Sequence, residues 1–266
     1  MGLATSKWSL LPLRVCAMLS LPDDDRSEVP WSMHALGQEG IVVRFGDGRY
    51  PQTEAAIGFG AVVRAAHVAG VCEVATALTS VLVRFDPAAV ARDVLAARLR
   101  YLLDAPRGAE RTRGRLWTIP ACFGGDAGPQ LAEAAGLAGL SEADARAELA
   151  ACEVSVLAIG FAPGQPYLGH LLPRWDLPRQ QALTPQVPAG ALVVALRQVV
   201  LFANPSPTGW RWIGRCAFAP FRADRAEPFA LRAGDRISWA VTDASTIADL
   251  AGQADGLGGA TCEGLS

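Results

Sequence analysis

Glycine and proline crowd one ten-residue stretch, Gly160 to Gly169, which reads GFAPGQPYLG. Glycine permits positive φ angles and close backbone approach, whereas proline fixes φ and removes a hydrogen-bond donor. Because neither a helix nor a central strand can continue through such a run, we expect a rigid surface loop. This loop would present Phe161, Gln165 and Tyr167 at defined angles.

Two similar segments follow, VPAG at Val187 to Gly190 and NPSPTGW at Asn204 to Trp210. Several short strands with hardly any helix between them predict a small closed barrel or a sandwich over residues 152–243. The three stiff loops would meet at the rim of the barrel and form one site. The expected strands are Glu153–Ile159, Ala191–Leu196, Val199–Ala203, Arg211–Ile213 and Arg236–Val241.

The part of the chain before residue 121 has a different pattern. Strands alternate with two helices, one beginning at Pro51 and one after Asp86-Pro87, and the order βαββαβ predicts a ferredoxin-like α+β domain over residues 34–120. The strands are expected at Ile41–Phe45, Val71–Thr76, Val81–Phe85 and Leu116–Pro120. The helix stripes expected to face the core are Ile57, Ala61, Ala65 and Val68, then Val90, Val94, Ala97 and Tyr101.

Three segments lie outside these two domains. Residues 1–33 are predicted to be a disordered extension and residues 244–266, which are rich in glycine, a flexible tail. The alanine-rich residues 121–151 are predicted to form a helical connector, in which Ser141 and Asp144 resemble a capping box. The sequence contains no apolar run of about 18 residues, so no transmembrane helix is expected.

Composition excludes several classes of protein. A net charge of −2 over 266 residues argues against a nucleic-acid or membrane-surface protein, because either would need a basic face. Lys7 is the only lysine, which excludes a phosphate-binding GxxxxGK loop and a Schiff-base lysine from the body of the chain. The six cysteines show no CxxC spacing, so no metal site is predicted. Scattered cysteines of this kind are typical of reduced thiols in a cytoplasmic protein.

Candidate functional residues cluster at the stiff loops. His170 directly follows the first loop and is a candidate acid–base group. Arg179 and Arg215 lie beside the loops, where a guanidinium could bind a carboxylate or simply remain solvated. Aromatic side chains could floor a pocket or only plug the barrel, and these alternatives remain open. They are Phe161, Tyr167 and Trp210.

The loops occur in an order that resembles a known family. GF.PG.PYLG is followed by Pro178-Arg179, VPAG, SP.GW and Ile213-Gly214-Arg215, and the segment GG.D.GP precedes them at Gly124 to Pro129. This set, over about residues 34–242, resembles the B-type subunit of 5-oxoprolinase. The family is also called allophanate hydrolase subunit 1 and includes the Kip-type sensor-kinase inhibitor. Its members usually have phenylalanine where Gln165 stands and a second arginine where Thr184 stands.

The resemblance implies a ferredoxin-like α+β domain followed by an all-β cyclophilin-like barrel. It also implies a related partner, the C-type subunit of the oxoprolinase complex. With this partner the assembled complex opens 5-oxoproline to glutamate at the expense of ATP, although no nucleotide-binding motif is recognisable in this chain. In this interpretation His170 and Arg215 are catalytic, and a small amide or carboxylate substrate is held by the side chains Phe161, Gln165, Tyr167, Arg179 and Trp210. The alternative is a non-catalytic regulator that binds and inhibits a sensor histidine kinase.

Overall fold

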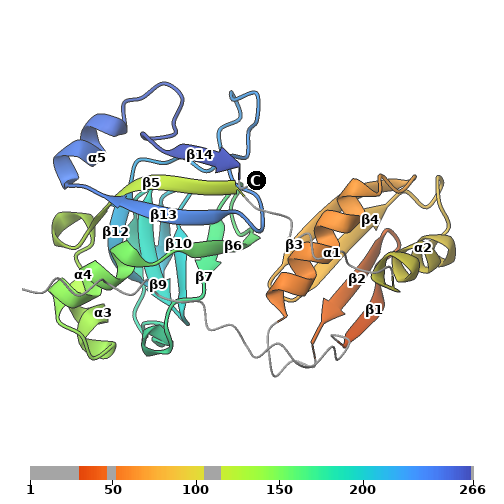
Figure 1. The fold of residues 1–266 in the computed structure, drawn as a ribbon, viewed down its shortest axis with the longest axis horizontal. Coiled ribbons are helices and arrows are strands. Elements are labelled where there is room, and N and C mark those ends of the chain that lie inside the picture. Colours follow the sequence, from red (N-terminus) through yellow and green to blue (C-terminus); the bar gives the residue numbers. More distant parts are fainter. Residues whose placement is uncertain (1–29, 47–51, 105–114, 265–266) are drawn as a thin grey trace, which may run out of the picture.

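The computed structural model describes residues 30–46, 52–104 and 115–264. Figure 1 shows a small α+β layer, coloured red to yellow, beside a barrel coloured green to blue. Each part has its own hydrophobic core. The N-terminal part consists of β1 (Trp31–Leu36), β2 (Gly40–Phe45), α1 (Thr53–Ala65), β3 (Val71–Ala77), β4 (Ser80–Phe85) and α2 (Arg92–Asp104).

The N-terminal sheet is antiparallel, with strand order β1-β2-β4-β3, and α1 and α2 pack on it. The strand predicted at Leu116–Pro120 is absent from this sheet and belongs to the barrel. The fourth strand is instead β1, whose first residues, Trp31 to Met33, fall within the predicted disordered extension. The βαββαβ order of a ferredoxin-like domain is therefore not confirmed, because the elements run ββαββα. The rest of the predicted extension, residues 1–29, lies outside the described residues.

The predicted core stripes of both helices were largely wrong, although Val68, which follows α1, and Val90, which precedes α2, pack against the core. In α2 the buried side chains are Leu95, Leu99 and Leu103, whereas Val94 and Tyr101 are 59% and 64% exposed. The sequence placed the start of this helix at Asp86-Pro87, but these residues form a turn in which the Asp86 carboxylate accepts a hydrogen bond from the Ala88 N–H group. In α1 the buried face is centred on Ala56, Phe59 and Val63 rather than on the predicted stripe of Ile57, Ala61, Ala65 and Val68.

The second part of the chain is a closed barrel. Its seven strands follow one another around the ring, and the pairing of β12 with β5 closes it. β13 runs parallel to β5, and the neighbouring pairs around the rest of the ring are antiparallel. The strands are β5 (Arg115–Phe123), β6 (Val154–Ile159), β7 (Pro166–Gly169), β9 (Ala191–Ala195), β10 (Gln198–Leu201), β12 (Arg211–Cys216) and β13 (Arg236–Val241).

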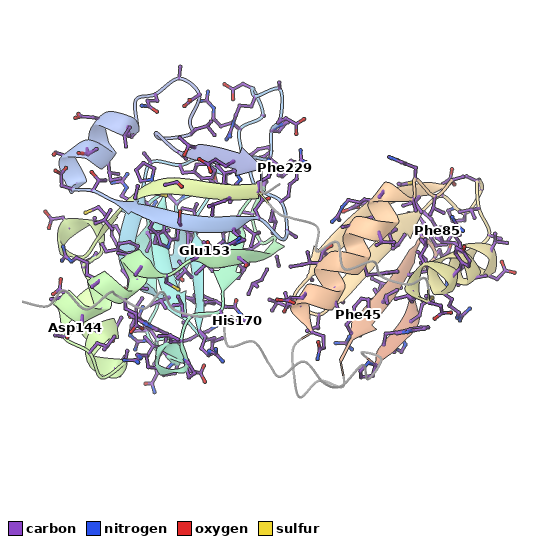
Figure 2. All side chains as sticks on the ribbon, viewed as in Figure 1. Phe45, Phe85, Asp144, Glu153, His170 and Phe229 are labelled. Atoms are coloured by element: carbon purple, nitrogen blue, oxygen red, sulfur yellow. The ribbon has the colours of Figure 1, made fainter. Side chains whose placement is uncertain are left out.

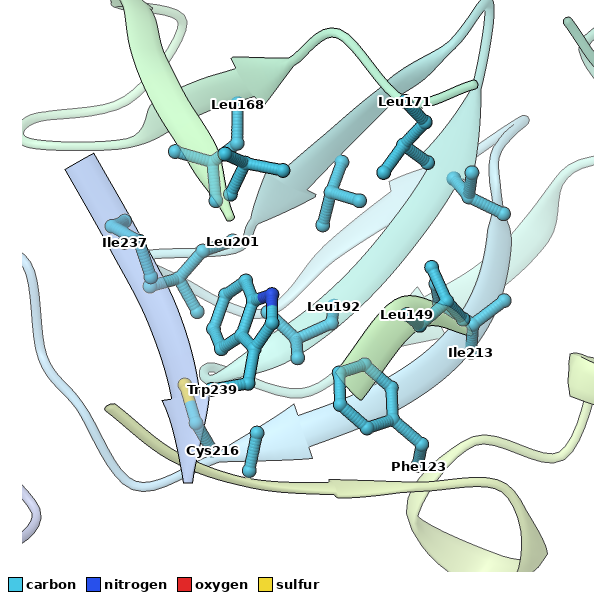
Figure 3. Packing of buried hydrophobic residues seen from close by; sticks show 14 of the residues in the cluster. Phe123, Leu149, Leu168, Leu171, Leu192, Leu201, Ile213, Cys216, Ile237 and Trp239 are labelled. Carbon is cyan, nitrogen blue, oxygen red and sulfur yellow. The ribbon is translucent and has the colours of Figure 1, made fainter. Parts of the chain in front are cut away.

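The interior of the barrel is filled by side chains. Figure 3 shows Leu168, Leu192, Leu201 and Ile237 pointing into one cluster, to which Trp239 also belongs. A second apolar cluster, which contains Val193, Val200 and Phe202, lies on the opposite face of β9 and β10. It also includes Val187 of a two-stranded sheet formed by β8 (Thr184–Val187) and β11 (Ser206–Thr208). The barrel is therefore a packed core rather than a pore.

Five barrel strands were predicted near their observed positions, namely β6, β9, β10, β12 and β13. The first stiff segment, however, is not one loop. Its first half makes the tight turn between β6 and β7, with Phe161 and Gly164 at φ of +71° and +73°. Its second half is β7 itself, which pairs with β6 and β10. Pro166 is tolerated there because it is the first residue of the strand.

The segments predicted to flank the barrel pack onto it. In the predicted connector, α3 (Leu131–Leu137) and α4 (Glu142–Ala151) contribute Leu131 and Leu149 to the barrel core. The Ser141 hydroxyl caps α4 by accepting the Asp144 N–H at 3.1 Å, as predicted. The prediction of a flexible tail was wrong for residues 244–264. These residues form α5 (Ala244–Leu250), capped by Asp243, and β14 (Thr261–Gly264), which pairs with β5.

Two glycines near α3 test how tightly this helical region is packed. A Cβ atom on Gly128 would lie 2.1 Å from the carbonyl carbon and oxygen of Ile213 in β12, whereas a Cβ on Gly136 would meet nothing within 4 Å. We expect Gly128→Ala to lower the free energy of unfolding by about 2–3 kcal/mol or more. Gly136→Ala should raise it by about 0.5–1 kcal/mol, since alanine loses less entropy in a helix. Urea denaturation of both variants measures this difference, and equal effects would contradict the packing described here.

Candidate functional site

A cleft of about 520 Å³ lies beside the ends of β10 and β12. One wall is α5, which contributes Ala244, Ile247 and Ala248, continued by Ala251. Ile247 is buried against the cluster formed with Cys122 and Ala127, so it anchors the helix, while the alanines leave the cleft open. The wall offers small apolar groups and no polar side chain.

The VPAG turn forms another part of the cleft lining through Ala189 and Gly190. Gly190 has φ of +81°, and a Cβ there would lie 2.1 Å from the carbonyl oxygen of Cys216. The Gly190 N–H donates to the Phe202 carbonyl at 2.8 Å, and the Gly190 carbonyl accepts the Cys216 N–H at 2.9 Å. Glycine is thus required where the turn is pressed between β10 and β12.

Arg215 is the cation of the cleft. Its side chain is exposed on β12 and makes no hydrogen bond or ion pair with the described residues. Arg211, four residues earlier on the same strand, contrasts with it: this arginine is buried, pairs with Glu133 at 2.8 Å and donates to the Pro178 carbonyl at 2.7 Å. Arg211 is therefore structural, whereas the guanidinium of Arg215 is available to an anion.

The other chemical groups of the cleft are Asp126 and Cys216. Asp126 lies in a single 3₁₀ turn, η1 (Gly125–Ala127), directly after β5. Burial raises the pKa of the Cys216 thiol to about 12, and the thiol donates to the Gly190 carbonyl at 3.6 Å. Burial therefore favours the protonated thiol at neutral pH, and a protonated thiol is a poor nucleophile.

Gln165 supports the rim of the cleft from inside the fold. Its side chain is 1% exposed, and its Oε1 atom accepts the N–H of Ala203, a residue that lines the cleft, at 3.4 Å. It was predicted to contact substrate, but its burial makes it a supporting residue. Phe161, on the same turn, is 78% exposed and does not line the cleft.

The other predicted aromatic residues lie elsewhere. Tyr167 and Trp210 meet edge to face, with ring centroids 6.3 Å apart, in the apolar cluster on the opposite face of β9 and β10 from the core. The Arg179 guanidinium lies 5.8 Å from the centroid of the Trp210 ring. Because neighbouring residues in a strand face opposite sides, Leu168 enters the core and Tyr167 does not. The three predicted aromatic residues therefore do not line this cleft.

His170 is also separated from Arg215. It follows β7, whose last residue, Gly169, pairs with Gln198 at the turn between β9 and β10, whereas Arg215 pairs with Ala191 at the start of β9. Figure 2 shows His170 at the lower edge of the barrel, whereas α5 lies at its upper edge in Figure 1. Burial and then the charge of Arg197 lower the pKa of His170. His170 thus has no contact with the cleft.

The described residues include no group of three or more His, Cys, Asp or Glu side chains placed to hold a metal ion. None of the described helices is long and apolar enough to span a bilayer. The residues that line the cleft include one unpaired cation, one carboxylate and small apolar groups. Arg215 was singled out from the sequence and lies at this cleft, whereas Asp126 and α5 were not singled out, although the GG.D.GP motif contains Asp126.

A family model described as "Carboxyltransferase domain, subdomain C and D" matches residues 31–231. The chain belongs to this family. It is 29% identical over 222 residues to the B-type subunit of 5-oxoprolinase from Bacillus subtilis strain 168, covering 79% of this chain and 92% of that protein. It is 33% identical over 152 residues to the corresponding subunit from Escherichia coli O157:H7, covering 57% and 69%. The resemblance to the B-type subunit is confirmed, and the modest identities fit a divergent member of the carboxyltransferase-domain family.

Solved structures share the carboxyltransferase-domain fold. The crystal structure of TTHA0988 matches with a TM-score of 0.65 and 30% identity, covering 77% of this chain but 40% of that one, so the chain spans about two fifths of TTHA0988. The Kluyveromyces lactis urea amidolyase matches with a TM-score of 0.69 over 91% of this chain and 17% of its own, at 15% identity. This last likeness concerns the fold alone. The α5 helix lies beyond residue 231, outside the region that the family model matches.

Thiol labelling tests the burial of the cleft wall. Cys72 is exposed, whereas Cys216 is buried and its pKa is raised to about 12. We expect iodoacetamide at pH 8 to modify Cys72 in the native protein, and to modify Cys216 only after denaturation. Peptide mass spectrometry measures both sites in one sample. Rapid native labelling of Cys216 would show that the cleft wall opens or that the thiol is activated.

Proposed function

We propose that this chain is the B-type subunit of an ATP-dependent 5-oxoprolinase-type amide hydrolase, which opens 5-oxoproline to glutamate together with a C-type partner subunit. The relatives that are named as subunits of 5-oxoprolinase support this reaction and a multi-subunit complex. The observation that carries the proposal is Arg215, an unpaired guanidinium in the cleft built by the VPAG and IGR motifs of the family.

The cleft fits one end of such a substrate. A guanidinium binds a carboxylate through two parallel hydrogen bonds, which fixes its orientation as well as its position. The alanines of α5 line the same cleft and would contact the methylene groups of a small ring. A compact carboxylate with an apolar body is therefore the ligand that suits these walls.

The remaining chemistry is assigned to the partner subunit. The side chains that line the cleft include no histidine and no lysine, and Cys216 is held protonated. A triphosphate carries several negative charges, whereas the lining provides a single guanidinium, so the cleft does not fit ATP. In the proposed complex this chain binds and orients the substrate, and the partner subunit provides the nucleotide site and the proton-transfer groups.

Arginine variants test the assignment of the carboxylate site. Titration calorimetry of 5-oxoproline into the complex with the partner subunit should show that Arg215→Ala weakens binding by about 1.5–3 kcal/mol, roughly tenfold to a hundredfold. Arg215→Lys should weaken it less, because lysine keeps the charge but loses the planar fork. The matched control is Arg179→Ala, which removes an exposed arginine that stacks on Trp210 away from the cleft.

The control should bind 5-oxoproline as the unaltered chain does. If Arg179→Ala weakens binding as much as Arg215→Ala, the site lies on the other face of the barrel and the assignment is wrong. If the complex binds no 5-oxoproline and the chain instead inhibits a sensor histidine kinase, the regulator alternative replaces this proposal.

A further inference from the structure

The GG.D.GP segment, which the proposed function leaves without a role, is held firmly against β12. Gly124 and Gly125 have φ of +77° and +54°, a region that favours glycine. The Gly124 N–H donates to the Ile213 carbonyl at 3.0 Å, and the Gly128 N–H donates back to Gly124 at 3.1 Å. Since a Cβ on Gly128 would overlap the Ile213 carbonyl, η1 touches the backbone of β12 directly.

This contact places Asp126 at the same cleft as Arg215. In the strand pair that closes the barrel, Arg215 of β12 lies opposite Cys122 of β5. η1 begins three residues after Cys122 along the chain. Both side chains line the cleft, yet they form no ion pair with each other. Asp126, like Arg215, makes no side-chain hydrogen bond or ion pair within the described ranges 30–46, 52–104 and 115–264.

Two opposite charges that share a cleft without neutralising each other are suited to a ligand with two complementary ends. Opposite charges attract, yet these two side chains form no ion pair, while backbone contacts fix the segments that carry them. Arg215 requires an anion. A carboxylate such as that of Asp126 only accepts hydrogen bonds, so it requires an N–H or O–H donor. The alanines of α5, which line the same cleft, suit a ligand whose body is small and apolar.

We infer that Asp126 is a substrate-positioning residue, which accepts the ring N–H of the amide while Arg215 binds the carboxylate. This inference rests on the proposed function for the identity of the ligand. The cleft would then accept only some small carboxylates, because the ligand must carry both a carboxylate and an N–H donor. An ester analogue, in which oxygen replaces the ring N–H, places a lone pair against the Asp126 carboxylate and is rejected.

The test compares 5-oxoproline with 5-oxotetrahydrofuran-2-carboxylate, the lactone that differs only in this atom. Both are titrated by calorimetry into the full chain in complex with its partner subunit. The unaltered complex should bind the lactam at least about tenfold more tightly than the lactone, since the lactone leaves the carboxylate unpaired. Asp126→Ala should bring this ratio close to one. Arg215→Ala should weaken the binding of both ligands by a similar factor, so that the ratio of their affinities stays the same.

Asp249→Ala is the matched control, because Asp249 is an exposed acid of α5 that does not line the cleft. It should keep both affinities, and thermal unfolding should show that every variant remains folded. A lactam-to-lactone ratio that Asp126→Ala leaves unchanged, or a ratio near one in the unaltered complex, overturns this inference while the arginine site stands. If the unaltered complex binds neither ligand, the proposed function fails and the inference fails with it.

Discussion

The pairing of β5 with β12 closes the barrel, and the architecture of the cleft depends on it. One edge of β5 pairs with the parallel strand β13, and the other is shared between β14 and β12. The register that joins Gly214 to Phe123 and Arg215 to Cys122 fixes where β5 ends. The chain then turns through η1, where the Gly124 N–H donates to the Ile213 carbonyl and Gly128 packs against the β12 backbone, and Asp126 lines the same cleft as Arg215. The pairing that closes the barrel thus also helps to form the cleft.

The family motifs have two different structural roles. VPAG, IGR and GG.D.GP bring backbones together around the cleft, where Gly190 and Gly128 each contact a neighbouring strand without room for a side chain. PYLG and the SP.GW segment instead contribute Tyr167 and Trp210 to the apolar cluster on the opposite face of β9 and β10, which Arg179 borders. Some motif residues therefore line the cleft, whereas others pack in the apolar cluster. The order of the motifs in the sequence does not distinguish these two roles.

The sequence pattern predicted those elements that are determined by interactions between residues close together in the chain. The strands at β6, β9 and β10 and the Ser141 cap follow from alternation, turn residues and a side-chain hydrogen bond. The sheet that β5 joins could not be predicted, because its apolar sequence suits either domain and only long-range pairing decides. The predicted stripe of α2 was wrong because the helix begins later than Asp86-Pro87 suggests, although Leu95, Leu99 and Leu103 offered a better face. Arg215 was singled out through its motif, whereas the presence of Asp126 and α5 at the same cleft depends on contacts between segments far apart in the sequence.

We propose that the cleft lined by Arg215, Asp126 and α5 is the substrate site, and a crystal structure of the complex with 5-oxoproline bound would decide this. Electron density for the ligand is expected in this cleft, with its carboxylate on the Arg215 guanidinium and its ring N–H facing Asp126. Ligand density at His170 or against the Arg179–Trp210 pair, with the cleft empty, would contradict it.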